Sequence, residues 1–202
     1  MPEAGRVITG SAGGLRLDAP GPGTRPLSDR VKQALFSLLE AERPDVWAHA
    51  FLDLFAGSGA AGIEALSRGA PRAVLVERDG RAAAIVERNL ERTGLSARAR
   101  VIRRDVAAFL AGASAGVVEA PFGCVFVDPP YAQVGDLLAS LERLAAPGSG
   151  WLDEAALVTA KHFWKVPPPD RVGRLARIRE RRFGETALSV YRRGSETAAG
   201  ES

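Results

Sequence analysis

The sequence predicts an α/β fold: a mostly parallel sheet with helices on both of its faces. From residue 50 onward, short apolar runs alternate with longer segments whose apolar residues recur at helical spacing. This alternation is typical of parallel strands joined by crossover helices. A second observation concerns four carboxylates, each at or just after the carboxyl end of an expected strand: Asp53, Glu77, Asp105 and Asp128. Because ligands bind at that edge of a doubly wound sheet, we expect a Rossmann-like ligand-binding domain.

Residues 1–27 are expected to form a small hairpin extension followed by a linker. The run 5–18 consists of two strand-like segments around a glycine-rich turn. Residues 19–26 combine several Pro and Gly residues, as irregular linkers do. The linker is therefore expected to separate the hairpin from the main domain, 28–193.

The main domain is expected to open with a helix. Ser28 is a good N-cap, and Asp29 adds a negative charge to the first turn. Apolar residues at helical spacing follow on one face, which we expect to pack on the core. Arg30 and Lys32 are expected on the opposite, solvent-exposed face, with Arg25 just before the helix.

The remaining elements follow from the alternation of strand-like and helical patterns. Gly94 is expected to end one of the helices as a C-cap. The apolar run 122–127 must leave the sheet at Pro129 and Pro130, because proline cannot continue a strand ladder. The expected strands are 50–55, 73–77, 99–103, 122–127 and 155–160, and the expected helices are 58–68, 79–93, 105–111 and 134–145.

The carboxyl-terminal part has a different pattern. The strand-like runs 174–183 and 186–192 are separated by Gly184-Glu185, which predicts an antiparallel hairpin. In the first run, Arg177, Arg179 and Arg181 alternate onto one face. They are explained either by RNA binding or by protection of an edge strand against aggregation. Residues 194–202 are small and polar, and we expect a disordered tail.

Composition limits the classes of protein to which the chain can belong. Its 202 residues, 46% hydrophobic and 25% charged, suit one globular domain. Nothing approaches the roughly 18 consecutive apolar residues of a membrane span. A single cysteine, Cys124, excludes an internal disulfide and fits a cytoplasmic protein. One cysteine and two histidines also disfavour a zinc site. A net charge of +3 permits a nucleic-acid partner without requiring one.

A glycine-rich turn follows the first strand of the main domain. Gly57-Ser-Gly59-Ala-Ala-Gly62 has the dinucleotide-binding spacing, with an expected strand before it and an expected helix after it. Glu77 lies 20 residues beyond Gly57, where a carboxylate can hold ribose hydroxyls. Taken alone, this motif supports an enzyme that binds NAD as readily as any other.

Asp53 favours a different cofactor. A carboxylate at this strand end repels a pyrophosphate and attracts an ammonium group, while the helix start can still bind one carboxylate. S-adenosylmethionine carries an amino acid at one end and adenosine at the other, so it satisfies both conditions. Asp105 stands where it could accept a hydrogen bond from the adenine amine, and it is equally suited to cap a helix.

The turn Asp128-Pro129-Pro130-Tyr131 suits a flat substrate that carries an exocyclic amine. It offers a carboxylate and a prolyl carbonyl as two hydrogen-bond acceptors, and an aromatic ring for stacking. The alternative interpretation is a strand-terminating turn with a capping Asp. If the doubly wound fold is correct, the turn lies beside the methyl group of the bound cofactor.

These motifs together resemble a known family. Asp-Leu-Phe-Ala-Gly-Ser-Gly, Gly-Ile-Glu-Ala-Leu-Ser-Arg-Gly-Ala and Val-Asp-Pro-Pro-Tyr are similar to the bacterial 16S rRNA guanine-N2 methyltransferases that modify guanine 966. The resemblance spans about residues 5–193. It includes Thr24-Arg-Pro-Leu-Ser-Asp-Arg-Val-Lys-Gln-Ala-Leu-Phe and the closing Arg-Phe-Gly-Glu-Thr-Ala-Leu-Ser-Val-Tyr. Asp-Pro-Pro-Tyr alone marks amino-directed methyltransferases generally, and the Arg-Pro-x-x-Asp-Arg segment narrows the match.

The resemblance implies a class I methyltransferase with a seven-stranded sheet whose last strand is antiparallel, and S-adenosylmethionine as methyl donor. It also implies rRNA of the small ribosomal subunit, or of its assembling precursor, as substrate. From composition we expect no membrane partner and no metal. The expected catalytic residues are Asp128, Pro129, Pro130 and Tyr131. The expected cofactor-binding residues are Asp53, Phe55, Ala56, Gly57, Ser58, Gly59, Glu77, Arg78, Asp105 and Val106. The expected substrate-binding residues are Arg25, Ser28, Asp29, Arg30 and Lys32.

The chain departs from the family pattern at two places. The hairpin run Ser11-Ala-Gly-Gly-Leu15 lacks the basic and aromatic residues that the family often has there. At the end of the fifth strand, Lys161 replaces an acidic residue. Two other functions remain open from the motifs: an adenine-N6 methyltransferase acting on DNA or RNA, and an NAD-dependent oxidoreductase, which leaves the Asp-Pro-Pro-Tyr turn unexplained.

Overall fold

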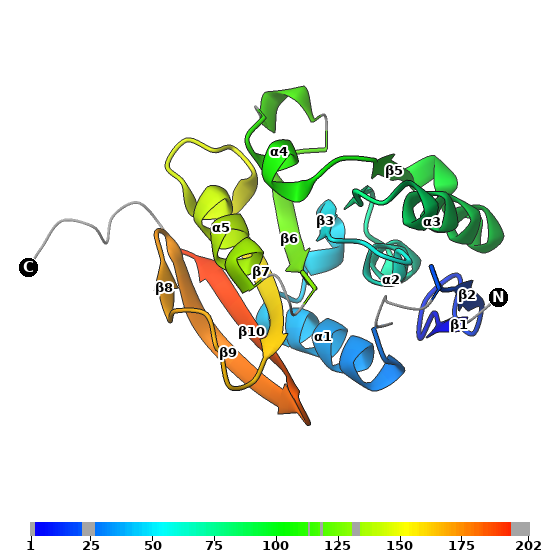
Figure 1. Cartoon of the computed structure of the whole chain (residues 1–202), viewed down its shortest axis with the longest axis horizontal. Helices are drawn as coiled ribbons and strands as arrows, with labels where there is room; N and C mark the ends of the chain where they lie inside the picture. Colours follow the sequence, from blue (N-terminus) through cyan, green and yellow to red (C-terminus); the bar gives the residue numbers. More distant parts are fainter. Residues whose placement is uncertain (1–2, 22–26, 113, 118, 131–133, 195–202) are drawn as a thin grey trace, which may run out of the picture.

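The computed structural model describes residues 3–21, 27–112, 114–117, 119–130 and 134–194. Its main sheet has the strand order β5-β4-β3-β6-β7-β10-β9-β8, and β1 and β2 form a separate two-stranded sheet. Figure 1 shows this small sheet beside α2 and α3, at the opposite end of the molecule from β8 and β9. Within the described part of the chain, none of the helices combines the length and the apolar composition that crossing a bilayer requires.

The predicted fold class is confirmed. The parallel strands are β3 (Phe51–Leu54), β4 (Ala73–Val76), β5 (Ala99–Ile102), β6 (Phe122–Val127) and β7 (Leu152–Phe163). β10 (Thr186–Arg193) runs antiparallel between β7 and β9 (Leu175–Phe183). The expected count of seven strands is corrected by a two-residue eighth, β8 (Arg171–Val172), at the edge. The amino-terminal hairpin is β1 (Glu3–Arg6) with β2 (Arg16–Asp18).

The helices lie close to their predicted positions. They are α1 (Asp29–Glu42), α2 (Ala60–Arg68), α3 (Gly80–Thr93), α4 (Val106–Leu110) and α5 (Val134–Ala145), with short 3-10 turns at Val46–Ala48, Ser96–Arg98 and Ser114–Gly116. Gly94 ends α3 in the left-handed conformation, as predicted. The strand β7 extends three residues beyond 155–160 at each end, because pairing with β6 and β10 holds polar residues that break its apolar pattern.

Two apolar cores lie on the two faces of the sheet. Side chains alternate along each strand, so that Phe51 joins one core and Leu52 the other. α1, α2 and α3 contribute to the first core, and α4 and α5 to the second. Helices cover both faces of the sheet. The charged functional groups of the sheet therefore lie at the ends of its strands.

Buried polar side chains of α2 hold the amino-terminal hairpin. The carboxylate of Glu64, fully buried, accepts hydrogen bonds from the backbone N–H groups of Ile8 at 2.7 Å and Thr9 at 3.1 Å. It also pairs with Arg68 Nε at 2.9 Å. The Ser67 hydroxyl accepts the N–H of Ala12 at 2.9 Å. The segment Gly-Ile-Glu-Ala-Leu-Ser-Arg thus docks the hairpin.

Lys32 is a correction to the predicted exposed face of α1. Its side chain is fully buried, and its Nζ donates to the backbone carbonyl of Arg6 and lies 3.6 Å from Asp29 Oδ1. Burial lowers the pKa of the Lys32 ammonium group. The expectation was wrong because the hairpin folds back over this face, a contact that helical spacing alone does not contain.

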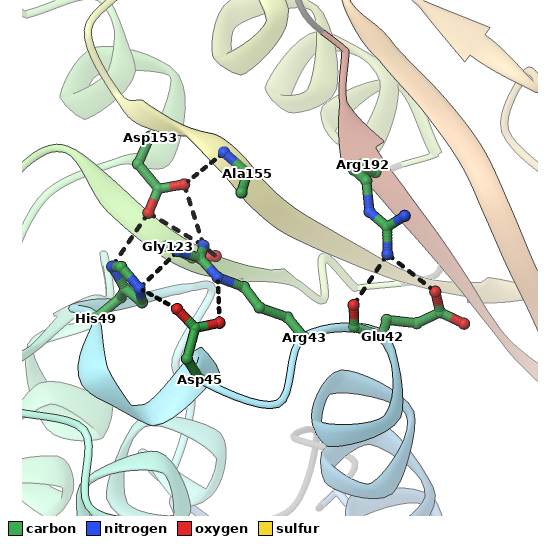
Figure 2. Close-up of polar contacts among 8 residues, drawn as sticks. All are labelled: Glu42, Arg43, Asp45, His49, Gly123, Asp153, Ala155 and Arg192. Atoms are coloured by element: carbon green, nitrogen blue, oxygen red, sulfur yellow. Dashed lines mark hydrogen bonds and ion pairs between the residues drawn. The ribbon is translucent and has the colours of Figure 1, made fainter.

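At the amino-terminal edge of the parallel strands, a cluster of charged side chains ties α1 to the sheet (Figure 2). The buried Arg43 donates to the carbonyl of Gly123 at 3.2 Å and to both Asp153 oxygens at 3.1 Å. His49 lies between Asp153 and Asp45. A side chain at Gly123 would meet His49 Cβ at 2.3 Å, so only glycine lets the cluster form. This edge is fixed by ion pairs.

We expect Glu64→Gln to lower the free energy of unfolding by roughly 2 kcal/mol, because the amide loses the charge-assisted bond to Arg68 and one acceptor. Urea unfolding of the purified variant measures this. Glu87→Gln, on the exposed face of α3, is the matched control and should change little. Equal stabilities of the two variants would show that Glu64 does not anchor the hairpin.

Candidate active site

The tips of the central parallel strands meet at the topological switch point. Sequence-adjacent connections run outward from β3 to β4 and β5 on one side, while β6 and β7 lie on the other. Backbone hydrogen bonds continue past the strand ends: Asp128 N to Leu54 O at 3.4 Å, and Ala56 N to Val76 O at 3.0 Å. The edge carrying Asp53, Glu77 and Asp128 is therefore one continuous surface, as the sequence predicted.

The loop after β3 has an unusual backbone. Phe55 has φ 66, the one positive value among the described non-glycine residues, and Gly57 and Gly59 have φ 58 and 79. Glycine takes such angles without strain, whereas Phe55 must be held there by its surroundings. At Gly62, a Cβ would meet Leu75 Cδ2 at 2.6 Å. The glycines thus allow the tight turn and the close packing of α2 on β4.

Asp53 lies beneath this loop. Its side chain is 2% exposed, and Oδ2 accepts the backbone N–H of Gly62 at 2.9 Å. Burial raises the pKa of Asp53 to about 7, the Gly62 hydrogen bond opposes the shift, and the charges of Asp128 and Glu77 add to it. A cationic ligand would favour the ionised form of this carboxyl group.

Glu77 and Asp105 organise the backbone at their strand tips. The half-buried Glu77 carboxylate accepts the N–H groups of Gly57 and Asp79, each at 2.8 Å, and so links β4 to the glycine-rich loop. Asp105 is exposed and caps α4 by accepting the N–H of Ala108 at 3.2 Å. The capping interpretation is confirmed, and its contact with adenine stays a prediction. Val106 is buried in the second core.

Several expected cofactor-binding residues lie around this loop. Ala56 and Ser58 are buried, and Phe55 is half-buried. Arg78, one residue beyond Glu77, is exposed. Of these four side chains, Arg78 alone is exposed to solvent.

Asp128 forms an ion pair that the sequence did not predict. Lys161 Nζ, from the end of β7, lies 2.6 and 2.7 Å from the two Asp128 oxygens. The side chains are 17% and 10% exposed. Burial raises the pKa of Asp128, and Lys161 opposes that shift. Pro129 is buried and Pro130 exposed, while Tyr131 falls outside the described residues.

The expected substrate-binding residues do not form one surface. Ser28 caps α1, accepting the N–H of Val31 at 3.4 Å, and Asp29 pairs with Arg6 at 3.4 Å. Arg30 is exposed, whereas Lys32 is buried under the hairpin. Arg25 falls outside the described residues. Only Arg30 of the described set presents a positive charge to solvent.

Asn89 is a second residue that sequence reasoning missed. It is fully buried in α3, and its amide nitrogen donates to the carbonyls of Ser58 at 2.9 Å and Asp18 at 3.0 Å. It therefore connects the hairpin to the glycine-rich loop. The available signal was an amide on the apolar stripe of a predicted helix. Among the described residues, no three His, Cys, Asp or Glu side chains group closely enough to hold a metal ion.

A Rossmann-like sheet with β10 antiparallel between β7 and β9, and a glycine loop and acidic tips at its switch point, defines a class I methyltransferase. This class takes its methyl group from S-adenosylmethionine. The chain belongs to the family described as Conserved hypothetical protein 95, which it matches over residues 5–192.

Named relatives agree with this class. Ribosomal RNA small subunit methyltransferase D of Escherichia coli (strain K12) is 36% identical over 192 residues, which are 95% of this chain and 91% of the relative. YlbH of Bacillus subtilis (strain 168) is 36% identical over 191 residues, covering 93% and 98%. The solved structure of yhhF from Escherichia coli has a TM-score of 0.78 at 34% identity, covering 95% of this chain and 98% of that chain.

The pKa of Asp53 predicts how stability depends on pH. The folded protein keeps a proton on Asp53 that the unfolded chain releases from about pH 4, so the contribution of Asp53 to stability falls with rising pH until about pH 7. Asp53→Asn cannot ionise and keeps an acceptor for Gly62 N–H. Relative to wild type, the free energy of unfolding of this variant should rise by up to about 4 kcal/mol between about pH 4 and about pH 7, and the difference should stay constant above that range.

Urea unfolding of both proteins at several pH values measures this gain. Glu77→Gln provides a control for the removal of a carboxylate at a neighbouring strand tip. A stability difference between Asp53→Asn and wild type that is constant from about pH 4 to about pH 8 would contradict the assignment of a raised pKa to Asp53.

Proposed function

We propose that this protein transfers a methyl group from S-adenosylmethionine to the exocyclic N2 amine of a guanine in 16S rRNA, of the guanine 966 type. The substrate is the small ribosomal subunit or its assembling precursor, and the compartment is the bacterial cytoplasm. The observation that carries the proposal is the convergence of the Asp53 tip and glycine loop with the Asp128-Pro129 turn at one switch point. The E. coli relative is named as an rRNA small subunit methyltransferase, which supports the RNA class.

The residues around the glycine loop fit the proposed cofactor. Buried Asp53 supplies the negative charge that an ammonium group needs, and the first turn of α2 supplies N–H groups for a carboxylate. Glu77 uses its carboxylate for two backbone bonds and retains lone pairs for ribose hydroxyls. When bound, S-adenosylmethionine supplies an electrophilic methyl group. The polar and charged groups at this edge hold it in one orientation.

Asp128 and the Pro129 carbonyl position the target amine. The lone pair of guanine N2 is delocalised into the ring, so the nitrogen is a poor nucleophile. Two acceptors that bind its N–H groups favour a pyramidal nitrogen and direct its lone pair outward. The nitrogen becomes acidic only as its new N–C bond forms, and Asp128 can then accept the departing proton. The base must be unstacked to reach this turn.

Lys161 holds Asp128 for this role. The ammonium group binds both carboxylate oxygens, yet a carboxylate has about four lone-pair positions and can accept an amine N–H as well. Lys161 also opposes protonation of Asp128, which burial favours. We therefore propose that Lys161 keeps Asp128 ionised and correctly oriented.

Labelled methyl transfer to small subunits from a strain that lacks its own enzyme tests the function. Nucleoside analysis after digestion should give N2-methylguanosine. The appearance of N6-methyladenosine would instead support the adenine-directed alternative, and the absence of transfer to any RNA would reject the proposal.

We expect Asp128→Ala to lower the single-turnover transfer rate by ~10²-fold or more, as loss of one oriented transition-state group does. Affinity for S-adenosylhomocysteine should change little. Asp128→Asn keeps an acceptor without the charge and should be intermediate. If Asp128 is only a turn cap, its removal costs about 1 kcal/mol of stability and leaves the rate unchanged. Melting curves of the same variants separate these outcomes.

Lys161→Met should shift the acidic limb of the pH–rate profile to higher pH, because burial favours protonated Asp128 and the opposing charge of Lys161 is removed. A shift of about one pH unit lowers the rate below that limb roughly tenfold. Lys161→Arg keeps a cation and should retain most of the wild-type profile. Profiles of Lys161→Met and wild type that coincide would show that Lys161 has no effect on Asp128.

A further inference from the structure

We propose that the end of the β9–β10 hairpin, with the residues that follow β7 and the start of α1, forms the surface that docks RNA beside the transfer site. We call it the tip surface and define it by Arg30, Trp164, Lys165, Arg181, Arg182 and Phe183. This inference rests on the proposed function, because it assigns the binding surface for the same substrate.

Cations and aromatic rings are interleaved on the tip surface. Arg182 Cζ lies 3.5 Å from the centroid of Trp164, and Lys165 Nζ lies 5.5 Å from the same ring. Arg181 Cζ and Arg30 Cζ lie 5.6 and 6.0 Å from the centroid of Phe183. Such contacts hold the cationic groups over rings. The four cationic side chains are exposed and the two rings half-buried, so the charges face solvent.

The tip surface lies at the edge of the sheet that carries the candidate active site. Phe163, the last residue of β7, pairs with Thr186, and Thr186 also pairs with Phe183 across the hairpin. Lys161, which binds Asp128, is three residues before Trp164. Three residues of strand span about 10 Å. Nucleotides that flank a base at Asp128 therefore come within reach of the tip.

Two other arginines of this hairpin, both on β9, pair with carboxylates. Arg177 pairs with Glu180 at 2.8 Å and also with Asp170, and Arg179 pairs with Glu42 at 2.7 Å. These pairs lie along β9, where charged side chains also suit an edge position. The three alternating arginines therefore have two roles. Arg177 and Arg179 pair with carboxylates, and Arg181 belongs to the tip surface to which we assign RNA contact.

The chemistry of the tip surface fits RNA. Guanidinium and ammonium groups bind phosphates, and rings or guanidinium planes stack on unpaired bases. Glu185 is the acidic residue in this turn, set against the four cations. An RNA that presents an unstacked guanine at Asp128 also offers unpaired neighbours to these groups.

The test uses the double variant Arg181→Gln and Arg182→Gln, which removes two exposed charges and leaves the half-buried rings in place. Binding to protein-free 16S rRNA and to small subunits from a strain that lacks the enzyme is measured over a range of salt. We expect affinity to fall about tenfold and the salt dependence to lose close to two counterions. Affinity for S-adenosylhomocysteine should be unchanged.

Two further variants complete the design. Arg100→Gln, on β5 at the other end of the sheet and 48% exposed in its side chain, removes a surface charge away from the tip and should have little effect. The double change of Arg181 and Arg182 to Lys keeps the charge. Any loss of RNA affinity in this variant therefore measures the contribution of the planar guanidinium groups. If the wild-type protein methylates the RNA and the Gln variant binds that RNA equally well, the tip-surface inference is rejected while the proposed function stands. If wild type neither binds nor methylates either RNA, the proposed function and the inference both fail.

Discussion

The site depends on how two carboxylates are kept at neighbouring strand tips with little access to water. Asp53 is 2% exposed and Asp128 is only partly exposed, and each raises the electrostatic free energy of the other. Such groups are tolerated when hydrogen bonds and opposite charges compensate for the lost hydration. Gly62 N–H does this for Asp53 and Lys161 for Asp128. The close packing of α2 brings Gly62 N–H to Asp53, and the length of β7 brings Lys161 to Asp128.

The glycine loop is supported from behind by polar groups that do not face the site. Asn89 binds the carbonyl of Ser58 within the loop and the backbone of Asp18 in the hairpin. Glu64 and Lys32 bind the same hairpin from α2 and α1. The side chains of Asn89, Glu64 and Lys32 are fully buried, so each would lack both hydration and a partner if the hairpin detached. The small hairpin therefore belongs to the scaffold of the glycine loop.

The amino-terminal and carboxyl-terminal ends of the parallel strands have different electrostatic roles. At the amino-terminal edge, Arg43 is saturated by Asp153, Gly123 and its neighbours, which fixes α1 against β6 and β7 (Figure 2). At the carboxyl edge, carboxylates gather at the strand tips and cations at the end of the hairpin. Fixed pairing at one edge leaves the other free to bind charged ligands, the division typical of doubly wound domains.

The sequence by itself determined the fold class, the order of elements and the acidic strand tips, because hydrophobic periodicity and turn residues are local signals. It also predicted the capping roles open to Ser28 and Asp105. Only the tertiary structure decided that Lys32 is buried, that Lys161 binds Asp128, and that Arg179 pairs with Glu42. These outcomes depend on contacts between residues 33 to 137 positions apart, or on which chain segment covers a helix face. No local pattern encodes such contacts, since a charged residue has the same spacing whether it faces water or a partner.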